Sequence, residues 1–517
     1  MKIYMNNRGV TIPIVLIVLL ITIIFGFAIM SMISTQAKIN TIDDASKKAF
    51  EYAEAGYNAY MWHLNDDVNF YSTNESKNMQ NIDIPFREGF YKLEVTKPSD
   101  TDRFVTIKST GWTKNNPSVN RTILVKIRKK QFVHHVYVSD SDGENIWWTS
   151  GDESHGPYHT NETLRIQKSP KFYDTVTYSS SFVKGTGYSP DFKVKDPIQP
   201  QKVDRLEFPK NNEKLREWAE KDDMVFQGRT CIYLDGKYIK IRNGNDKEEE
   251  IIRRPISEIG NKVIYVEGEQ ESDVRRKFNL NAGNVFISGK IEGKLTIAAS
   301  NNIYITYDDP TKWYEAEDRN NENPPVETPL NGGIYYFNTT FTPENELSVY
   351  DSEKKIYTRY ANGKDMLGLI ANNDVLILHF GWPKYKGNSA DKTYWSYKWE
   401  KQRYWDWGWK YRWIKNNFNY DVAPHDISIH AAIFAVTGGF GYEDYEDSNW
   451  WGNTRKGNIT LWGNITQKTR KAVGLIGSTG YNKLYAHDPR MFYDYPPHIL
   501  EPTNVGWEIH EWKEIND

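Results

Sequence analysis

The chain has 517 residues, and its composition excludes several broad classes of protein. Hydrophobic residues make up 39% of the chain and aromatic residues 14%, so it has enough apolar surface to bury a sizeable core and is not globally disordered. Its mean hydropathy of −0.70 excludes a polytopic membrane protein. Acidic and basic residues nearly cancel, 68 against 65, so no bulk field attracts nucleic acid or anionic membranes. The single cysteine, Cys231, excludes an intramolecular disulfide and argues against a cysteine-based zinc site. The 34 tyrosines and 18 tryptophans favour β-rich architecture.

The N-terminus contains a long uncharged segment. Residues 10–33 are almost wholly apolar and exceed the roughly 20 residues that a helix needs to span a bilayer. Lys2 and Arg8 precede the segment, which predicts a cytoplasmic N-terminus and an exterior location for the rest of the chain. A secretory signal peptide, the alternative, has an apolar core of only about 7–15 residues. We therefore expect a retained transmembrane helix over residues 10–33.

The helical pattern continues beyond the apolar segment. Small or apolar residues recur there in steps of three and four, as expected for one stripe of an amphipathic helix: Ile42, Ala45, Ala49, Ala53, Gly56, Tyr60 and Leu64. No proline interrupts residues 14–84. The pattern predicts a continuous helix from about residue 11 to residue 64, roughly 80 Å long.

This N-terminal module resembles that of type IV pilins, and more closely that of PilX-like minor pilins. The matching pieces are a basic leader ending in Asn7-Arg8-Gly9, an apolar helix from Val10, and the run AFEYAEAG at residues 49–56, which is similar to the A-F-x-A-A-E-A-G signature of that group. The resemblance implies that a prepilin peptidase cuts after Gly9 and leaves Val10 as the first mature residue. Ile14 stands where major pilins carry a glutamate, which implies a minor or tip-like subunit. An uncleaved membrane anchor for a surface domain is the alternative.

Three alternating runs follow the helix, at residues 89–95, 103–108 and 121–127, with turn residues between them. They predict an antiparallel meander with one buried face. The pilin resemblance implies the same small sheet, packed on the amphipathic half of the helix. We therefore predict an α+β pilin-like unit, with an amphipathic helix and small antiparallel sheet over residues 34–130.

The pattern changes over residues 131–495, where short apolar runs recur at close spacing. In the clearest stretch, the expected inward-pointing residues are Val285, Ile287, Leu295, Ile297, Ile303 and Ile305. Strands this short cannot bury a face alone, and spacings of eight to ten residues predict the stacked rungs of a β-solenoid, or β-helix. A β-sandwich remains open because the periodicity is irregular. One helix is expected at residues 212–222 and a C-terminal tail at residues 496–517.

The same region is similar to an uncharacterised bacterial domain that often follows the PilX-type N-terminus. The resembling pieces are residues 156–161, 283–285, 367–375, 429–433 and 485–490. This resemblance implies no biochemical activity.

An aromatic insertion occupies residues 381–420. Five of its rings alternate along the chain: Trp405, Trp407, Trp409, Tyr411 and Trp413. On a hairpin, this alternation places them on one face. Nine Lys or Arg against three Asp or Glu give residues 384–415 a net charge of +6. Such rings are suited to binding surface polysaccharide or single-stranded nucleic acid. We favour burial of the rings against the rest of the domain and expect no specific nucleic-acid partner.

Residues 139–145 begin like a calcium loop, with Asp140, Asp142 and Glu144 as the candidate ligands. A complete EF-hand loop needs a glutamate at its twelfth position, where this chain has Gly151. We therefore expect a solvated turn, with no metal and no other cofactor.

Four histidines lie close together in the sequence: His134, His135, His155 and His159. No metalloprotease motif, nucleophile elbow, Walker A loop or Rossmann fingerprint accompanies them. We expect ordinary structural histidines and no enzymatic activity.

Together these features predict a minor pilin or pseudopilin-like component of a type IV pilus or secretion-type filament, which displays a large β-rich domain outside the cell. The expected partners are the membrane, the prepilin peptidase and other pilin subunits. The first alternative is a membrane-anchored surface adhesin or carbohydrate-binding module, with surface polysaccharide as its partner. A β-helix enzyme acting on polysaccharide is the second.

Overall fold

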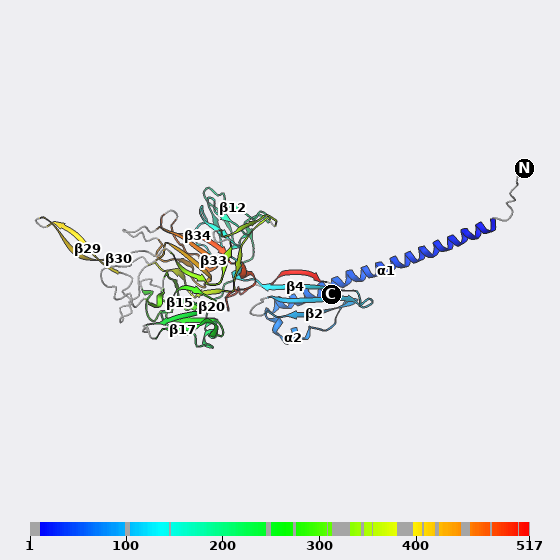
Figure 1. Ribbon diagram of the computed structural model, residues 1–517, viewed down its shortest axis with the longest axis horizontal. Coiled ribbons are helices and arrows are strands. Elements are labelled where there is room, and N and C mark those ends of the chain that lie inside the picture. The colour runs from blue at the N-terminus through cyan, green and yellow to red at the C-terminus, as the bar shows by residue number, and fades with distance from the viewer. Residues whose placement is uncertain are drawn as a thin grey trace. The chain divides into compact units, whose positions relative to one another are not determined.

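The computed structural model describes residues 11–515 apart from 99–103, 144–145, 245–249, 272–275, 308, 313–330, 343–345, 354, 380–395, 406–407, 419–422, 446–454, 476–477 and 505. Over residues 396–405, 409 and 411–418 the description covers the backbone alone. The chain divides into two compact units (Figure 1). Unit 1 comprises residues 1–129 and 506–517, and unit 2 comprises residues 130–505.

Unit 1 combines one long helix with a five-stranded antiparallel sheet, in the order β1-β2-β3-β4-β35. Its elements are α1 (Thr11–Asp66), a 3₁₀ helix (Phe70–Ser72), α2 (Asn74–Asn78), β1 (Ile84–Phe86), β2 (Gly89–Thr96), β3 (Val105–Thr113), β4 (Asn120–Lys129) and β35 (Trp507–Ile515). The expected long helix is confirmed. Where the sequence predicted a tail over residues 496–517, the structure has β35, which pairs with β4.

The second half of α1 packs closely on this sheet. Ala49 and Ala53 are fully buried. A Cβ atom added at Gly111 of β3 would lie 2.2 Å from the carbonyl oxygen of Ala49 and 2.4 Å from the amide nitrogen of Ala53. On the helix, a Cβ atom added at Gly56 would lie 2.3 Å from the Ser109 hydroxyl oxygen. The small residues of the predicted stripe therefore allow the helix and β3 to meet at backbone distance.

Unit 2 is almost entirely β. Its strands are β5 (Tyr137–Ser141), β6 (Glu153–His155), β7 (Tyr158–Thr160), β8 (Leu164–Ile166), β9 (Lys171–Phe172), β10 (Val176–Tyr178), β11 (Phe182–Lys184), β12 (Asp191–Phe192), β13 (Gln201–Lys202), β14 (Val225–Gln227), β15 (Thr230–Gly236), β16 (Tyr238–Asn243), β17 (Ile252–Pro255), β18 (Val263–Glu267), β19 (Val285–Ile291), β20 (Lys294–Ala299), β21 (Ile303–Ile305), β22 (Asn331–Tyr336), β23 (Thr340–Thr342), β24 (Val349–Asp351), β25 (Ile356–Thr358), β26 (Tyr360–Asn362), β27 (Met366–Ala371), β28 (Val375–Ile377), β29 (Ser396–Trp405), β30 (Trp409–Phe418), β31 (Asp426–Ala435), β32 (Phe440–Tyr442), β33 (Arg455–Thr469) and β34 (Gly480–His487). The helical elements given for the described residues include α3 (Lys214–Glu220) and the 3₁₀ turns Phe132–His134, Ile256–Glu258 and Pro489–Phe492. The expected helix at 212–222 is therefore present but shorter.

Parallel, in-register pairing organises the core of unit 2. It aligns one buried residue from each of eight strands in a single column: Ile264, Ile297, Leu369, Ile433, Ile465, Tyr137, Tyr158 and Val176. The six residues that the sequence predicted to point inward, at positions 285, 287, 295, 297, 303 and 305, are all fully buried. Short strands thus gain a core by stacking on their neighbours, because no single strand is long enough to bury a face alone.

Both faces of β19 are covered. Ile287 belongs to the main core, whereas Phe286 joins a second buried cluster with Cys231 and Tyr304. The Phe286 and Tyr304 rings stack with their centroids 4.9 Å apart. Unit 2 therefore buries apolar side chains on both sides of this part of the ladder.

Candidate functional site

The first half of α1 is the clearest functional element of unit 1. Its large apolar side chains are exposed, including Ile12, Phe25 and Met32, and the first charged residue of the helix is Lys38. The helix is long and apolar enough to cross a membrane, judged by length and composition. A helical segment over residues 11–33 is about 35 Å long, against a hydrocarbon core of about 30 Å. Burial of so many exposed apolar side chains in lipid is strongly favoured over exposure to water.

One polar side chain in this segment, that of Thr22, is satisfied within the helix. The Thr22 hydroxyl donates a hydrogen bond to the Val18 carbonyl oxygen at 2.6 Å. Since lipid offers no hydrogen-bond partners, this back-bonding lowers the free energy of placing a threonine there. Ile14 lies near the start of α1 with its apolar side chain exposed. The leader and the two expected processing residues, Gly9 and Val10, lie outside the described residues.

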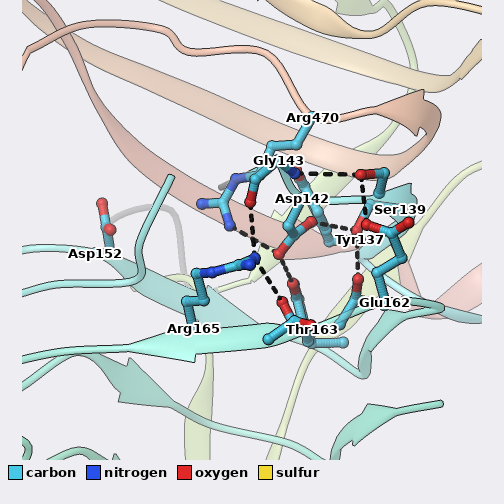
Figure 2. A network of polar contacts seen from close by, with 12 residues as sticks. Tyr137, Ser139, Asp142, Gly143, Asp152, Glu162, Thr163, Arg165 and Arg470 are labelled. Carbon is cyan, nitrogen blue, oxygen red and sulfur yellow. Dashed lines mark hydrogen bonds and ion pairs between the residues drawn. The ribbon is translucent and has the colours of Figure 1, made fainter. Parts of the chain in front are cut away.

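Asp142, a candidate calcium ligand that the sequence predicted to lie in a solvated turn, is fully buried in a polar network of unit 2 (Figure 2), so the prediction of a solvated turn is wrong. Its carboxylate accepts a hydrogen bond from the Tyr158 hydroxyl at 2.7 Å and forms an ion pair with Arg470 at 3.2 Å. The Ser139 hydroxyl donates to its other oxygen. Arg470 also lies over the rings of Tyr137 and Trp148, with its guanidinium carbon 5.5 and 5.0 Å from their centroids. The Asp142 carboxylate is therefore neutralised by the protein itself.

The network joins distant parts of the chain. Asp142 follows β5 and Arg470 follows β33, and their side chains meet although they are 328 residues apart. The two strands are parallel neighbours, with Ser141 aligned to Thr469. Burial raises the pKa of Tyr158 well above its usual value, and the nearby Asp142 charge adds to this effect. Tyr158 therefore remains a neutral hydrogen-bond donor at physiological pH.

Asp140 is engaged in a similar way. Its carboxylate forms ion pairs with Arg205 at 2.5 Å and Lys468 at 2.6 Å, and it accepts a hydrogen bond from the Asn161 amide at 2.7 Å. A calcium ion prefers six to eight oxygen ligands, whereas the partners here are cations and an amide donor. Glu144 lies outside the described residues, and among those described no group of three or more His, Cys, Asp or Glu side chains is placed to hold a metal. Sequence spacing gave no signal for these long-range cationic partners.

The aromatic insertion contains an antiparallel hairpin of β29 and β30, which pairs with no other strand in the described part of the chain. The register aligns Trp405 with Trp409, Arg403 with Tyr411, and Lys401 with Trp413. Directly opposed residues share one face of a two-stranded sheet. Trp407 lies outside the described residues, as do the side chains of the other four candidates: Trp405, Trp409, Tyr411 and Trp413. Our expectation that these rings pack against the rest of the domain, and do not bind a ligand, therefore stays a prediction.

Two of the histidines noted in the sequence are neighbours, with the ring centroids of His135 and His159 5.8 Å apart. Burial lowers the pKa of His135 to about 3, and the nearby His159 adds to the shift. Both ring nitrogens of His159 lie at hydrogen-bond distance from a partner, with Nδ1 2.9 Å from the Thr177 hydroxyl oxygen and Nε2 2.9 Å from the Asn161 amide oxygen. His155 has a different environment, between Glu153 and Ser348.

Comparisons with known proteins give limited information. Residues 88–181 match a family model described as "Domain of unknown function (DUF4900)", which covers parts of both units. No curated protein matches the sequence significantly. Among solved structures, the crystal structure of the competence-associated pilin ComZ from Thermus thermophilus matches with 9% identity and a TM-score of 0.27, over 91% of this chain and 97% of that chain. A TM-score this low lies below the range of shared folds.

Proposed function

We propose that the protein is a minor pilin or pseudopilin-like component of a type IV pilus or secretion-type filament. The observation that carries the proposal is α1, whose exposed, uncharged first half continues into a half that packs on an antiparallel sheet. The first half would hold the subunit in the membrane before assembly and contact neighbouring subunits afterwards. In this role the protein works through assembly and needs no cofactor.

In this proposal the N-terminus is cytoplasmic, and a prepilin peptidase removes residues 1–9 by cutting after Gly9. Ile14 supports a minor role, since it supplies no carboxylate for the amino terminus of a neighbouring subunit. Without this carboxylate, the charged amino terminus of the neighbouring subunit stays unpaired in lipid, which is costly. A subunit with an isoleucine here therefore suits the end of a filament better than its repeating body.

We further propose that unit 2 is a β-solenoid displayed outward. The parallel, in-register ladder supports this reading over a sandwich of antiparallel sheets. A surface adhesin is the second candidate function, with the β29–β30 hairpin as its binding element for surface polysaccharide. The hairpin favours this candidate because its register places aromatic and basic residues on one face.

The experiment is a pair of glycine variants expressed in a pilus-producing host. Gly9→Val should retain the leader and abolish incorporation into filaments, because the peptidase requires a small residue before the cut. Gly26→Val is the matched control, since a Cβ atom at Gly26 meets nothing within 4 Å and lies beyond the cut site. It should be processed normally. Filaments that incorporate uncut Gly9→Val at the wild-type level would contradict the proposal.

A further inference from the structure

A serine, a histidine and a glutamate meet beside the ladder in unit 2. Glu153 and His155 lie two residues apart on β6, so they share one face of the strand, while Ser154 between them is fully buried on the other. Nε2 of His155 lies 3.0 Å from a carboxylate oxygen of Glu153. Nδ1 of His155 lies 2.7 Å from the hydroxyl oxygen of Ser348. The histidine therefore links a carboxylate to a hydroxyl.

The parallel ladder fixes the histidine and the carboxylate. Lys171 of β9 is aligned with Glu153, and its ammonium nitrogen lies 2.8 Å from the carboxylate. Two residues further on, Tyr173 stacks on the His155 ring with a centroid distance of 3.9 Å and an interplanar angle of 14°. Stacking and hydrogen bonds thus hold the imidazole in one orientation.

Ser348 comes from a segment 193 residues away in the chain. It immediately precedes the β24–β25 hairpin, in which Tyr357 packs edge-on against Tyr173 with centroids 5.0 Å apart. Ser348 is 8% exposed. The hairpin therefore brings a shielded hydroxyl to the nitrogen of an oriented histidine.

Arg359, which follows β25, adds a second and independent observation. One of its terminal nitrogens binds Asp174 at 2.7 Å. Its Nε and Nη1 atoms are buried and have no hydrogen-bond partner among the residues that the structure describes. Asp174 directly follows Tyr173, whose ring stacks on that of His155, so this ion pair holds the guanidinium in the neighbourhood of the imidazole. Burial lowers the pKa of His155, and the Arg359 charge adds to this shift. Buried unpaired donors of this kind are rare, and they fit a site that stabilises negative charge developing on a ligand.

Protonation states complete the arrangement. The hydrogen bond from His155, together with Lys171, lowers the pKa of Glu153 to about 2 against the opposing effect of burial. At neutral pH the carboxylate is therefore ionised and accepts the Nε2 proton. A neutral His155 then has its lone pair on Nδ1, where it accepts the Ser348 hydroxyl proton. Relative to the Ser-His-Asp triad, the two ring nitrogens have exchanged roles: here Nδ1 faces the serine and Nε2 faces the carboxylate.

We propose that Ser348, His155 and Glu153 form a nucleophilic site that cleaves carboxylic esters. The Ser348 oxygen attacks the ester carbonyl carbon while His155 takes the hydroxyl proton, and Arg359 donates to the resulting oxyanion. The bond to the alcohol oxygen then breaks, and His155 returns the proton to the departing alcohol. Water attacks the acyl-serine, gives a proton to His155 and releases the carboxylic acid, after which Ser348 regains its proton. The balance is one ester and one water for one acid and one alcohol.

This activity goes beyond the proposed filament role and departs from the expectation of a protein that only assembles. It adds a chemical step on the displayed unit and does not depend on leader cleavage. The sequence showed Glu153 and His155 two residues apart, but nothing in it connected them to Ser348.

The test uses the full-length protein in detergent micelles and a fluorophosphonate, which labels activated serines. Peptide mapping by mass spectrometry should find the label on Ser348. Ser150 is the control within the same protein, because its hydroxyl hydrogen-bonds to another serine, Ser169, at 3.0 Å. The variant His155→Gln should slow the labelling by about 100-fold or more, as expected for loss of a general base.

A second readout is hydrolysis of p-nitrophenyl acetate. The wild type should hydrolyse it, and Ser348→Ala should lose that hydrolysis while melting at the same temperature. Labelling of Ser348 at the rate of Ser150 in the wild type would overturn the proposal, whatever the variants do. Undiminished hydrolysis by a folded Ser348→Ala variant would overturn it as well.

Discussion

Replacing Asp142 with alanine tests the buried polar network most sharply. The Asp142 side chain is fully buried and that of Arg470 is 3% exposed, so solvent does not screen their interaction. The substitution removes the partner of Arg470 and the acceptor for the Tyr158 and Ser139 hydroxyl groups. Breaking a buried ion pair on one side costs about 3–5 kcal/mol, because the other charge is left buried and unpaired.

The expected result is a large fall in thermal stability. A loss of about 3–5 kcal/mol corresponds to a drop of roughly 6–10 °C in the unfolding temperature, since larger domains shift by about 2 °C per kcal/mol. The assay is scanning fluorimetry on the full-length protein in detergent. The double variant Asp142→Ala/Arg470→Met should recover much of the loss, because it leaves no unpaired charge in the core.

The same assay separates this network from a calcium site. Because Arg470 neutralises Asp142, chelation with EDTA should leave the wild-type unfolding temperature unchanged. An Asp142→Ala variant that melts with the wild type would refute our account of the network. A clear destabilisation of the wild type by EDTA would refute it in favour of bound calcium.

Three further predictions concern unit 2. Ile297→Asp puts a charge into the buried column of the ladder and should cost several kcal/mol of stability, measured as a lower unfolding temperature of the full-length protein. A variant that melts at the wild-type temperature would show that the inward register is wrong. Burial lowers the pKa values of His135 and His430 to about 3 in the folded chain. Below pH 6.5 the unfolded chain therefore binds more protons than the folded chain. Stability should therefore fall by up to about 1.4 kcal/mol per pH unit and per histidine between pH 6.5 and pH 3, and pH-independent melting across that range would contradict this. If the rings of the hairpin are packed, as we expect, Trp405→Ala should cost roughly 3–5 kcal/mol of stability. If they bind polysaccharide, the variant should melt normally and lose binding. A variant with unchanged melting and unchanged binding would contradict both readings.

Local patterns in the sequence predicted much of unit 1. The uncharged apolar run and the absence of proline from residues 14–84 specify α1, and its small residues anticipate the close approach to Gly111. Alternating side chains predicted three strands, and β3 shows strict alternation of buried and half-buried residues. The sequence did not indicate β35, because its pairing with β4 joins residues about 380 positions apart, as between Arg128 and Glu508.

In unit 2 the sequence predicted which residues are buried but not which strands pair with each other. The inward positions follow from short-range alternation, which is a local property of each strand. The partners of each strand are not local, as Ile465 of β33 aligns with Tyr137 of β5. For the same reason the meeting of His155 with Ser348, and of Asp142 with Arg470, is visible only in the folded chain.

The intact mass of the mature protein, with sequencing of its N-terminal peptide, tests the central claim most directly. The protein would be isolated from the membranes and filaments of a host that has a prepilin peptidase. The filament account predicts a chain that begins at Val10 and lacks the nine-residue leader. A chain that still carries the residues before Val10, in filaments as in membranes, would contradict it and identify α1 as an uncleaved anchor.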